Sequence, residues 1–439
     1  MKNKSEIGEV DRISQLPDDV LVHIISRFTW REAVATSIIS TRWRRLCTYI
    51  TRLTFSTRHA SKHKYVQENG SSKHMKEIYD FLASSQSCRF LKEFEVNVPC
   101  LKGDNIKTWL PLVLDREVES IHIRLIYHDK AMSGYCNFPR RTLIKSKSGG
   151  LGSFAGLKSL RKLSLHSLHV DDRDVELFVS NCTTLEHLSI VGSYRLKKTS
   201  LVGHSKLKHL EISSSRNVVL IEVLDMINLV SLTCRKLQPK YSLHLNNVPK
   251  LVEFNSSDQF HLQGRVLHGI LPSVLDQLTY IDIRSTDLED ICIKQPPILT
   301  NLKHLKLEIK CVHGGRRTTF YHFPTRWKCP CLQKLEIKFL WKRNHVFHDT
   351  FDELWVELDE MGLYKVKPNE HLKEVTFSGF KGYRAETSLS WCLMKEAVAL
   401  KELIVELCDE TPDIRQSAAA LAWEHFRKIT PPSVNLVII

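Results

Sequence analysis

Apolar residues recur along most of this chain in one repeated unit: an apolar residue, two spacers, an apolar anchor, one spacer and a further apolar residue. The clearest copies are 160–165, 185–190, 207–212, 229–232, 251–254, 278–283 and 302–307. Successive central anchors, from Leu163 to Leu305, lie 25, 22, 22, 22, 27 and 24 residues apart. The alternation inside each unit predicts a short β-strand whose anchors enter a core and whose middle spacer lies on the opposite face.

The spacing of these units falls within the period of leucine-rich repeats. We therefore predict an α/β chain: a curved solenoid with parallel strands on its concave face and helices on its convex face. Asp171, Asp172 and Asp174 give one such helix an acidic first turn, and Asn181 suits its C-terminal end. Fainter copies of the unit have anchors at Phe94, Ile121, Leu335, Val375 and Leu403.

The region ahead of the repeats, 10–52, has a helical pattern instead. Pro17 suits a first helical residue, and apolar residues then follow at helical spacing. Thr29 and Glu32 have capping-box spacing for a second helix, and Ser40 can cap a third that carries Trp43. Three short helices are predicted.

This region has more apolar bulk than three short helices can bury, which indicates either a partner surface or packing on the rest of the chain. A helix-turn-helix that reads DNA is a further alternative, because Arg42, Arg44 and Arg45 lie on the third helix. Its other residues are largely apolar, which disfavours contact with base edges.

The runs Asp11 to Asp19, Ala33 to Ser37 and Ser40 to Leu46 resemble, in order, a plant-type F-box. The resemblance implies binding to a Skp-type adaptor and, through it, to the cullin scaffold of an SCF (Skp-cullin-F-box) ubiquitin ligase. It places six residues at or beside the adaptor groove: Leu16, Pro17, Ile24, Ile25, Val34 and Trp43.

The rest of the chain resembles plant proteins that join an F-box to leucine-rich repeats. The run Ser180 to Leu188 is typical of them, as is Trp109 ahead of a strand at 118–124, and 371–375, 379–382 and 400–403 resemble the C-terminal FBD module. The predicted parts are a flexible N-terminus (1–10), the F-box (11–52), a solenoid (53–365) with an insertion near 127–150, and FBD-like repeats with a cap (366–439). No regular repeat is seen in 340–368. A helix near 414–427 and a strand at 434–439 are predicted to close the chain.

Composition indicates the cellular compartment and shows where positive charge is concentrated. The first ten residues lack the apolar core of a signal peptide, no run is long enough for a membrane span, and the twelve cysteines are scattered singly. These features predict the nucleus or the cytoplasm. The net charge is +14, and 299–348 alone hold eleven Lys and Arg against two acids.

Repeat phasing places these strand spacers on the concave face: Glu211, Ser213, Arg235, Asp282, Arg284, Lys306, Glu308 and Lys338. Because the later repeats lie in the basic window 299–348, we predict that an anionic ligand binds there, with Arg235, Arg284, Lys306 and Lys338 as the candidate residues. The ligand could be an acidic or phosphorylated target segment, or a polyphosphate cofactor like those that some repeat-type F-box receptors hold. Arg316, Arg317, Arg326, Lys342 and Arg343 would lie in loops beside it. The alternative is a solvated surface with no ligand.

Catalytic and metal motifs are weak. The run Gly150-x-Gly152-x-x-Ala155 follows a polar stretch instead of a strand, which favours a loop over a dinucleotide site. Cys329-x-Cys331 and His345-x-x-His348 have tighter spacing than zinc ligands usually have. We therefore predict a non-catalytic substrate receptor of a ubiquitin ligase. The alternatives are a scaffold without a ligase role and a binder of an anionic ligand or, less favoured, nucleic acid.

Overall fold

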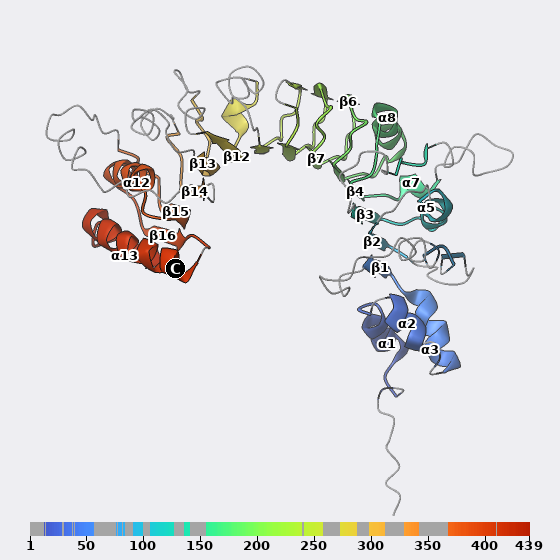
Figure 1. The fold of residues 1–439 in the computed structure, drawn as a ribbon. Helices are drawn as coiled ribbons and strands as arrows, with labels where there is room; N and C mark the ends of the chain where they lie inside the picture. Colours follow the sequence, from blue (N-terminus) through green and yellow to red (C-terminus); the bar gives the residue numbers. More distant parts are fainter. Residues whose placement is uncertain are drawn as a thin grey trace, which may run out of the picture. The chain divides into compact units, whose positions relative to one another are not determined.

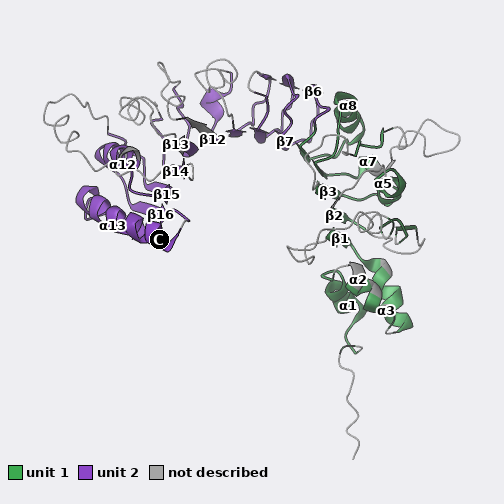
Figure 2. Cartoon of the chain, in the orientation of Figure 1, with its two compact units in different colours: residues 1–193 green, residues 194–439 purple. Residues whose placement is uncertain are grey.

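The computed structural model of the chain describes 13–56 apart from 14, 29, 37 and 39; 76–83 apart from 77 and 81; 91–99; 106–126; 136–140; 155–238; 241–257; 273–287; 298–311; 329–341; 368–409; and 411–439. The chain divides into two compact units, unit 1 (1–193) and unit 2 (194–439), which Figure 2 colours separately. The predicted N-terminal segment, most of the predicted insertion and 342–367 lie outside the described residues.

Unit 1 starts with the three predicted helices: α1 (Asp18–Ile25), α2 (Trp30–Thr36) and α3 (Thr41–Leu46), followed by a 3-10 turn (Cys47–Tyr49). Pro17 has an extended ψ of 152° and is the N-cap of α1, so the prediction that it is the first helical residue is wrong by one position. Ser40 caps α3 as predicted, because its side chain accepts a hydrogen bond from the backbone N–H of Trp43. Thr29 lies outside the described residues.

Five parallel strands follow in unit 1, in spatial order β1, β2, β3, β4, β5. They are β1 (Arg52–Ser56), β2 (Glu93–Pro99), β3 (Ser120–Ile126), β4 (Lys162–His166) and β5 (His187–Val191). The predicted anchors Phe94, Ile121, Leu163 and Leu188 occupy equivalent positions on neighbouring strands. All four are buried, which confirms the phasing of the repeat in this unit.

Helices cover one side of these strands: α5 (Ile106–Leu114), α7 (Ala155–Lys158) and α8 (Asp172–Asn181) (Figure 1). The ring of Trp109 on α5 lies 5.5 Å from that of Phe94 on β2, centre to centre. The start of α8 has a capping box, in which Asp171 and Asp174 each accept a hydrogen bond from the other's backbone N–H. The acidic first turn and the end at Asn181 are as predicted.

The main sheet of unit 2 is also parallel. In spatial order its strands are β7 (His209–Ser213), β9 (Ser231–Arg235), β11 (Glu253–Ser257), β12 (Tyr280–Asp287), β13 (His304–Cys311), β14 (Lys334–Trp341), β15 (Glu374–Phe380), β16 (Glu402–Leu407) and β17 (Asn435–Ile438). The predicted anchors share one register across it: Leu210, Leu232, Phe254, Ile281, Leu305, Leu335, Val375 and Leu403. The fainter copies of the repeat are therefore real.

Three repeats of unit 2 differ from the prediction of one helix per repeat. They carry a second, parallel sheet of short strands, β6 (Lys198–Val202), β8 (Leu220–Leu224) and β10 (Ser242–Asn246). Repeat length explains the difference. The ten residues of α8 rise about 15 Å, and a five-residue strand rises about 16 Å. A strand therefore spans the back of a repeat with fewer residues, which suits the three consecutive intervals of 22.

Seven successive strands, β4 to β10, are each followed by a residue with positive φ, which turns the chain out of the sheet. On the main strands of the two units these residues are Ser167 (58°), Gly192 (78°), Ser214 (53°) and Lys236 (52°). On the back strands they are Gly203 (68°), Asp225 (54°) and Asn247 (51°). The same turn thus recurs at the same point of successive repeats, whether or not glycine is present.

The end of unit 2 has two helices, α12 (Arg384–Glu396) and α13 (Pro412–Ile429), on the same side of β15 and β16 (Figure 1). The predicted helix at 414–427 lies within α13, whereas α12 was not predicted. Phe426 of α13 is buried against Phe377 and Phe380 of β15. A short 3-10 turn (Leu275–Gln277) precedes β12. In the part of the chain that the structure describes, no helix combines the length and apolar character needed to cross a membrane.

Candidate functional site

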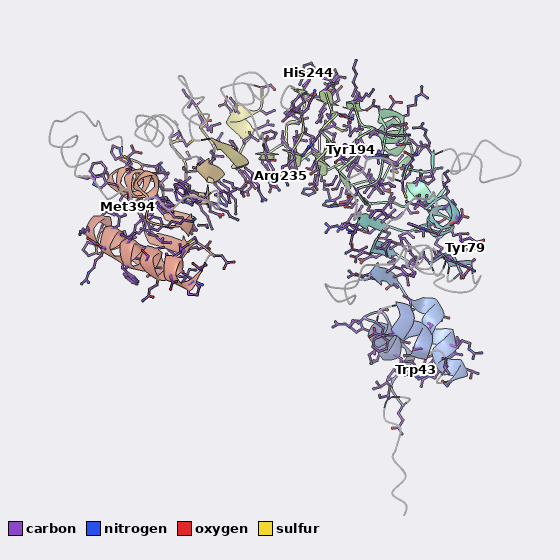
Figure 3. The ribbon with its side chains drawn as sticks, viewed as in Figure 1. Trp43, Tyr79, Tyr194, Arg235, His244 and Met394 are labelled. Carbon is purple, nitrogen blue, oxygen red and sulfur yellow. The ribbon has the colours of Figure 1, made fainter. Side chains whose placement is uncertain are left out.

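The N-terminal helices (18–46) have a core of their own, formed by Leu21, Ile25, Ala33, Trp43 and Leu46. Two of the six predicted adaptor residues, Ile25 and Trp43, are therefore buried inside this segment and hold its helices together. Figure 3 labels Trp43 at this position. The side chain of Val34, on α2, is not among those described.

The other three predicted residues reach the surface. Pro17 is exposed, and Leu16 and Ile24 are half-buried. Pro17, Val20 and Ile24 follow one another at helical spacing, so they form an outward stripe on α1, about a quarter turn around the helix from the buried Leu21 and Ile25. Two further apolar residues near α1 and α2 are exposed: Ile13, and Ile38, whose exposed fraction is 81%.

Arg42 of α3 fixes the chain that leads into α1. Its guanidinium donates to the backbone oxygen of Leu16 at 2.6 Å and, through Nε, to Oδ1 of Asp18 at 2.8 Å. Arg45 also contacts Asp18, at 3.3 Å. The side chains are partly exposed, so the ion pairs contribute little stability, but together with the bond to the Leu16 oxygen they fix the chain at Leu16 and Pro17, where the outward stripe begins.

A second candidate site lies on the main sheet of unit 2, on the face that carries the spacer residues. Along these strands the anchors are buried and the spacers between them are mostly half-buried or exposed, as the alternation predicts. Arg235 lies on β9, and Arg284, Lys306 and Lys338 lie on β12, β13 and β14. The structure therefore places the four predicted cations of the ligand face on one side of one sheet. Figure 3 labels Arg235 on this side and His244 of β10 on the other.

Two of these cations share one carboxylate. Oδ2 of Asp282 accepts a hydrogen bond from Arg235 at 2.7 Å and from Nε of Arg284 at 3.1 Å. Arg235 also donates to Asn255 on β11, at 3.3 Å. The Asp282 side chain is almost fully buried, and its Oδ1 atom has no hydrogen-bond partner among the described residues. A buried carboxylate without these two guanidiniums would be costly, so the three residues stabilise one another.

Glu336 on β14 is likewise a carboxylate shared by several side chains. It accepts from Lys306 at 2.6 Å and contacts His304 at 3.0 Å and Lys334 at 3.5 Å. The hydrogen bond to Glu336 raises the pKa of Lys306, so this lysine is charged at neutral pH. Burial acts to raise the pKa of Glu336, but the bond from Lys306 and the nearby charges hold that pKa below its ordinary value.

His304 contributes no charge to this face at neutral pH. Burial lowers its pKa, and Glu336 opposes that shift only in part. The ring of Tyr280 lies edge-on against it, at 4.8 Å between centres. Lys338 is exposed and has no ion pair with a described residue. The loop residues Arg316, Arg317, Arg326, Lys342 and Arg343 lie outside the described residues.

The phasing of the repeat placed Asp282 on this face together with the cations, but Glu336 and the ion pairs of both carboxylates were not predicted. Asp282 and Glu336 occupy the spacer position between two anchors, the same position as Lys306. Repeat phasing alone could therefore have placed Glu336 on this face as well. Their ion pairs also depend on strand register, which brings Asp282, Lys306 and Glu336 to one row across β12, β13 and β14.

The described residues include no activated cysteine nucleophile and no metal site. Burial raises the pKa of the Cys182 and Cys329 thiols to about 12 and also raises the pKa of Cys47, so none of these is an activated nucleophile. No group of three His, Cys, Asp or Glu residues suited to a metal ion occurs within the described ranges. His345, His348 and both glycines of the 150–155 motif lie outside them.

Comparison with known families gives two matches. The family described as "At1g61320/AtMIF1, LRR domain" matches residues 85–429, and the F-box domain family matches residues 13–53. The first covers the strands β2 to β16 and the helices between them. The second covers α1, α2, α3 and the start of β1.

Similar curated proteins come from Arabidopsis thaliana. Putative F-box/FBD/LRR-repeat protein At3g49030 is 26% identical over 84% of this chain and 87% of its own length. F-box protein At3g59000 is 24% identical over 92% of this chain and 88% of its own length. Putative F-box protein At3g58860 is 25% identical, and here the match spans about half of each protein, 51%.

Proposed function

Because this chain belongs to the At1g61320/AtMIF1 leucine-rich-repeat family and carries an F-box domain at 13–53, we propose that it is a substrate-recognition subunit of an SCF-type ubiquitin ligase. The F-box would bind a Skp-type adaptor, and through it the cullin, while the repeats would bind a target protein. The observation that carries the proposal is the outward apolar stripe of α1.

The stripe supports adaptor binding because the helices do not need it for their own packing. Leu21 and Ile25 already fill the inward face of α1, so Val20 and Ile24 remain for a partner. The exposed Ile38 adds apolar surface beside α2. Isolated apolar residues are normal on protein surfaces, but several on so small a segment are typical of an interface.

In this proposal the chain supplies proximity instead of chemistry. A target held on the repeats is kept near the conjugating enzyme that the cullin recruits, which raises the effective concentration of target lysines. The buried, high-pKa thiols of Cys182 and Cys329 agree with a receptor that transfers no ubiquitin through its own cysteines.

The test is capture of a purified plant Skp-type adaptor by the full chain. Val20→Asp should reduce capture at least about tenfold, because it buries a charge in an apolar interface. The matched control is Val202→Asp on β6 of unit 2, which makes the same change at another exposed valine and should leave capture unchanged. Leu16→Ala combined with Pro17→Ala should also abolish capture.

Two results would contradict the assignment: no capture by the wild type, or equal capture by wild type and Val20→Asp with both proteins folded. Reconstituted ubiquitination then separates a ligase receptor from a scaffold. A receptor promotes ubiquitin transfer to a bound target, and a scaffold that binds the same target does not.

We also propose that the protein acts in the nucleus or the cytoplasm. The eight cysteines whose side chains the structure describes are all free thiols, which suits a reducing compartment. A fluorescent fusion in plant cells tests this, and secretion of the fusion would overturn it.

A further inference from the structure

The spacer face of unit 2 has a surplus of positive charge that its own ion pairs do not cancel. Across the adjacent strands β9, β11, β12, β13 and β14 the described side chains of this face include five cations against four carboxylates, Glu253, Asp282, Glu308 and Glu336. We call the five the cation cluster: Arg235, Arg284, Lys306, Lys334 and Lys338. His304 does not add to this surplus at neutral pH, because burial lowers its pKa.

The cations also lie nearer the solvent than the carboxylates that pair with them. The exposed side-chain fraction is 2% for Asp282 and 21% for Glu336, against 41% for Arg284 and 38% for Lys306. A charge that is covered by protein presents less of its field to an approaching molecule than one at the surface. An incoming partner therefore meets mainly the positive groups.

The shared carboxylates hold the cations in place before any ligand arrives. Asp282 fixes Arg235 and Arg284, and Glu336 fixes Lys306 and Lys334. Long side chains usually lose rotamer entropy when they bind, and this loss is smaller for side chains that are already ordered. Arg284 reaches Asp282 through Nε alone, so its two terminal nitrogens have no partner among the described residues.

Register sets the spacing of the three most accessible cations. Arg284 and Lys338 lie in one row of the register, on either side of Glu308, and Lys306 lies in the neighbouring row, two residues away along the strands. Two anionic groups that lie two residues apart on an extended chain are about 7 Å apart, which matches the separation of these two rows. Glu374 on β15 limits the positive region on one side, where it contacts Lys334 at 3.4 Å, and Glu253 on β11 lies between the strands of Arg235 and Arg284.

We infer that the cation cluster binds a short acidic segment of the target protein, with anionic side chains at alternate positions. This inference rests on the proposed function in one respect, namely that the bound segment belongs to a target of the ligase. Binding of the acidic segment itself does not depend on adaptor binding. The anion can be a carboxylate or a phosphorylated side chain, because both accept hydrogen bonds from guanidinium and ammonium groups.

The test uses the full chain and three fluorescein-labelled ten-residue peptides, in which Gly alternates with Glu, with phosphoserine or with Gln. Fluorescence anisotropy should show binding of the Glu or the phosphoserine peptide, whichever matches the target, and at least about tenfold weaker binding of the Gln peptide. Binding should weaken as salt is raised from 50 to 300 mM, concentrations chosen to span roughly a twofold change in screening length.

Lys338→Glu is the sharpest variant, because Lys338 is exposed and breaks no described ion pair. It should weaken peptide binding about fivefold, and Lys338→Gln should weaken it about twofold. Lys198→Glu is the matched control: it makes the same change at an exposed lysine on the back strand β6 and should leave binding unchanged. Arg284→Gln, which adds no repulsion to Asp282, should also weaken binding.

Equal affinity for the Gln and the anionic peptides would overturn the inference, as would unchanged binding in both Lys338 variants with their melting temperatures intact. A competition experiment tests the nucleic-acid alternative, with a ten-nucleotide single-stranded nucleic acid and the unlabelled peptides as competitors. If the nucleic acid displaces the labelled Glu and phosphoserine peptides at a lower concentration than the unlabelled peptides do, the face binds nucleic acid instead. Adaptor capture by the same variants is measured in parallel. Normal capture with no peptide binding rejects this inference alone, and the reverse result rejects only the proposed ligase role.

Discussion

The carboxylate of Glu386 accepts a hydrogen bond from the indole N–H of Trp341, at 2.7 Å, although the two residues lie 45 positions apart. The other oxygen of Glu386 accepts from three consecutive backbone N–H groups, those of Lys381, Gly382 and Tyr383. Glu386 is fully buried, and burial raises its pKa to about 7. One side chain thus connects the end of β14 to the start of α12 and accepts the hydrogen bonds of the backbone N–H groups in the turn before that helix.

Removing this junction should destabilise unit 2. We expect Glu386→Ala to lower the free energy of unfolding by about 3 kcal/mol, because four half-buried donors lose their acceptor. Trp341→Phe removes one donor and keeps the aromatic contact with Tyr383, so it should cost about 1 kcal/mol. Urea unfolding measures both, and equal losses would show that the indole bond, not the cap, dominates.

Gly382 should tolerate no side chain. Its φ is +85°, and an added Cβ would lie 2.7 Å from Cδ1 of Leu421 on α13. Gly203 has a similar φ of +68° with open space around it, so Gly203→Ala measures the backbone cost alone, about 1 kcal/mol. Gly382→Ala should lower the free energy of unfolding by at least about 2 kcal/mol. The same loss in both variants would mean that Leu421 on α13 moves away from the added methyl group at no cost in stability.

His425 should make the protein sensitive to acid. It is buried on α13 against the Ser390 hydroxyl, at 2.8 Å, and burial lowers its pKa to about 4. The neutral ring is therefore favoured in the folded chain, so this contribution is complete above the ordinary pKa of about 6.5 and is lost as the pH falls toward 4.

Between pH 7 and pH 5 the expected loss from His425 is about 2 kcal/mol. The matched variant is His425→Gln, which cannot titrate. Glu386 shifts stability in the opposite direction over the same range, because its pKa is raised, so the difference between wild type and variant isolates the histidine. Parallel stability curves for the two proteins would rule out this role.

Truncation of a buried repeat anchor should destabilise the protein far more than truncation of an exposed side chain. Leu188→Ala in unit 1 and Leu210→Ala in unit 2 should each cost about 2–5 kcal/mol, because both side chains are buried and truncation leaves a cavity. Val202→Ala removes a similar side chain from an exposed position and should change the melting temperature little. A wild-type melting curve for Leu210→Ala would contradict the register described above.

The anchors could be predicted because a core needs an apolar residue at one fixed place in each repeat, and leucine spacing records that place directly. The back strands could also have been found. Their buried residues Leu201, Val223 and Leu245 follow the same interval of 22, but the expectation of helices hid this second series.

The candidate sites were only partly predictable. Both faces of α1 are apolar, so sequence alone did not show that Ile25 is buried and that Val20 and Ile24 lie outside. On the sheet, the pairing of Asp282 with Arg235 joins residues 47 positions apart. That contact follows from the register of three strands and not from any local pattern.

The positive-φ residue at the ends of successive strands has a consequence for how this chain can change in length. Ser214 and Lys236 end their strands in the same conformation, and they are 22 residues apart. Duplication of the block between them would therefore join two identical backbone geometries, and the new copy would enter the stack without altering its neighbours. Loss of one block would close the gap in the same way. Insertion or deletion of a whole block at this point should therefore keep every later anchor in register, whereas one residue inserted within a strand would turn its anchors to the opposite face.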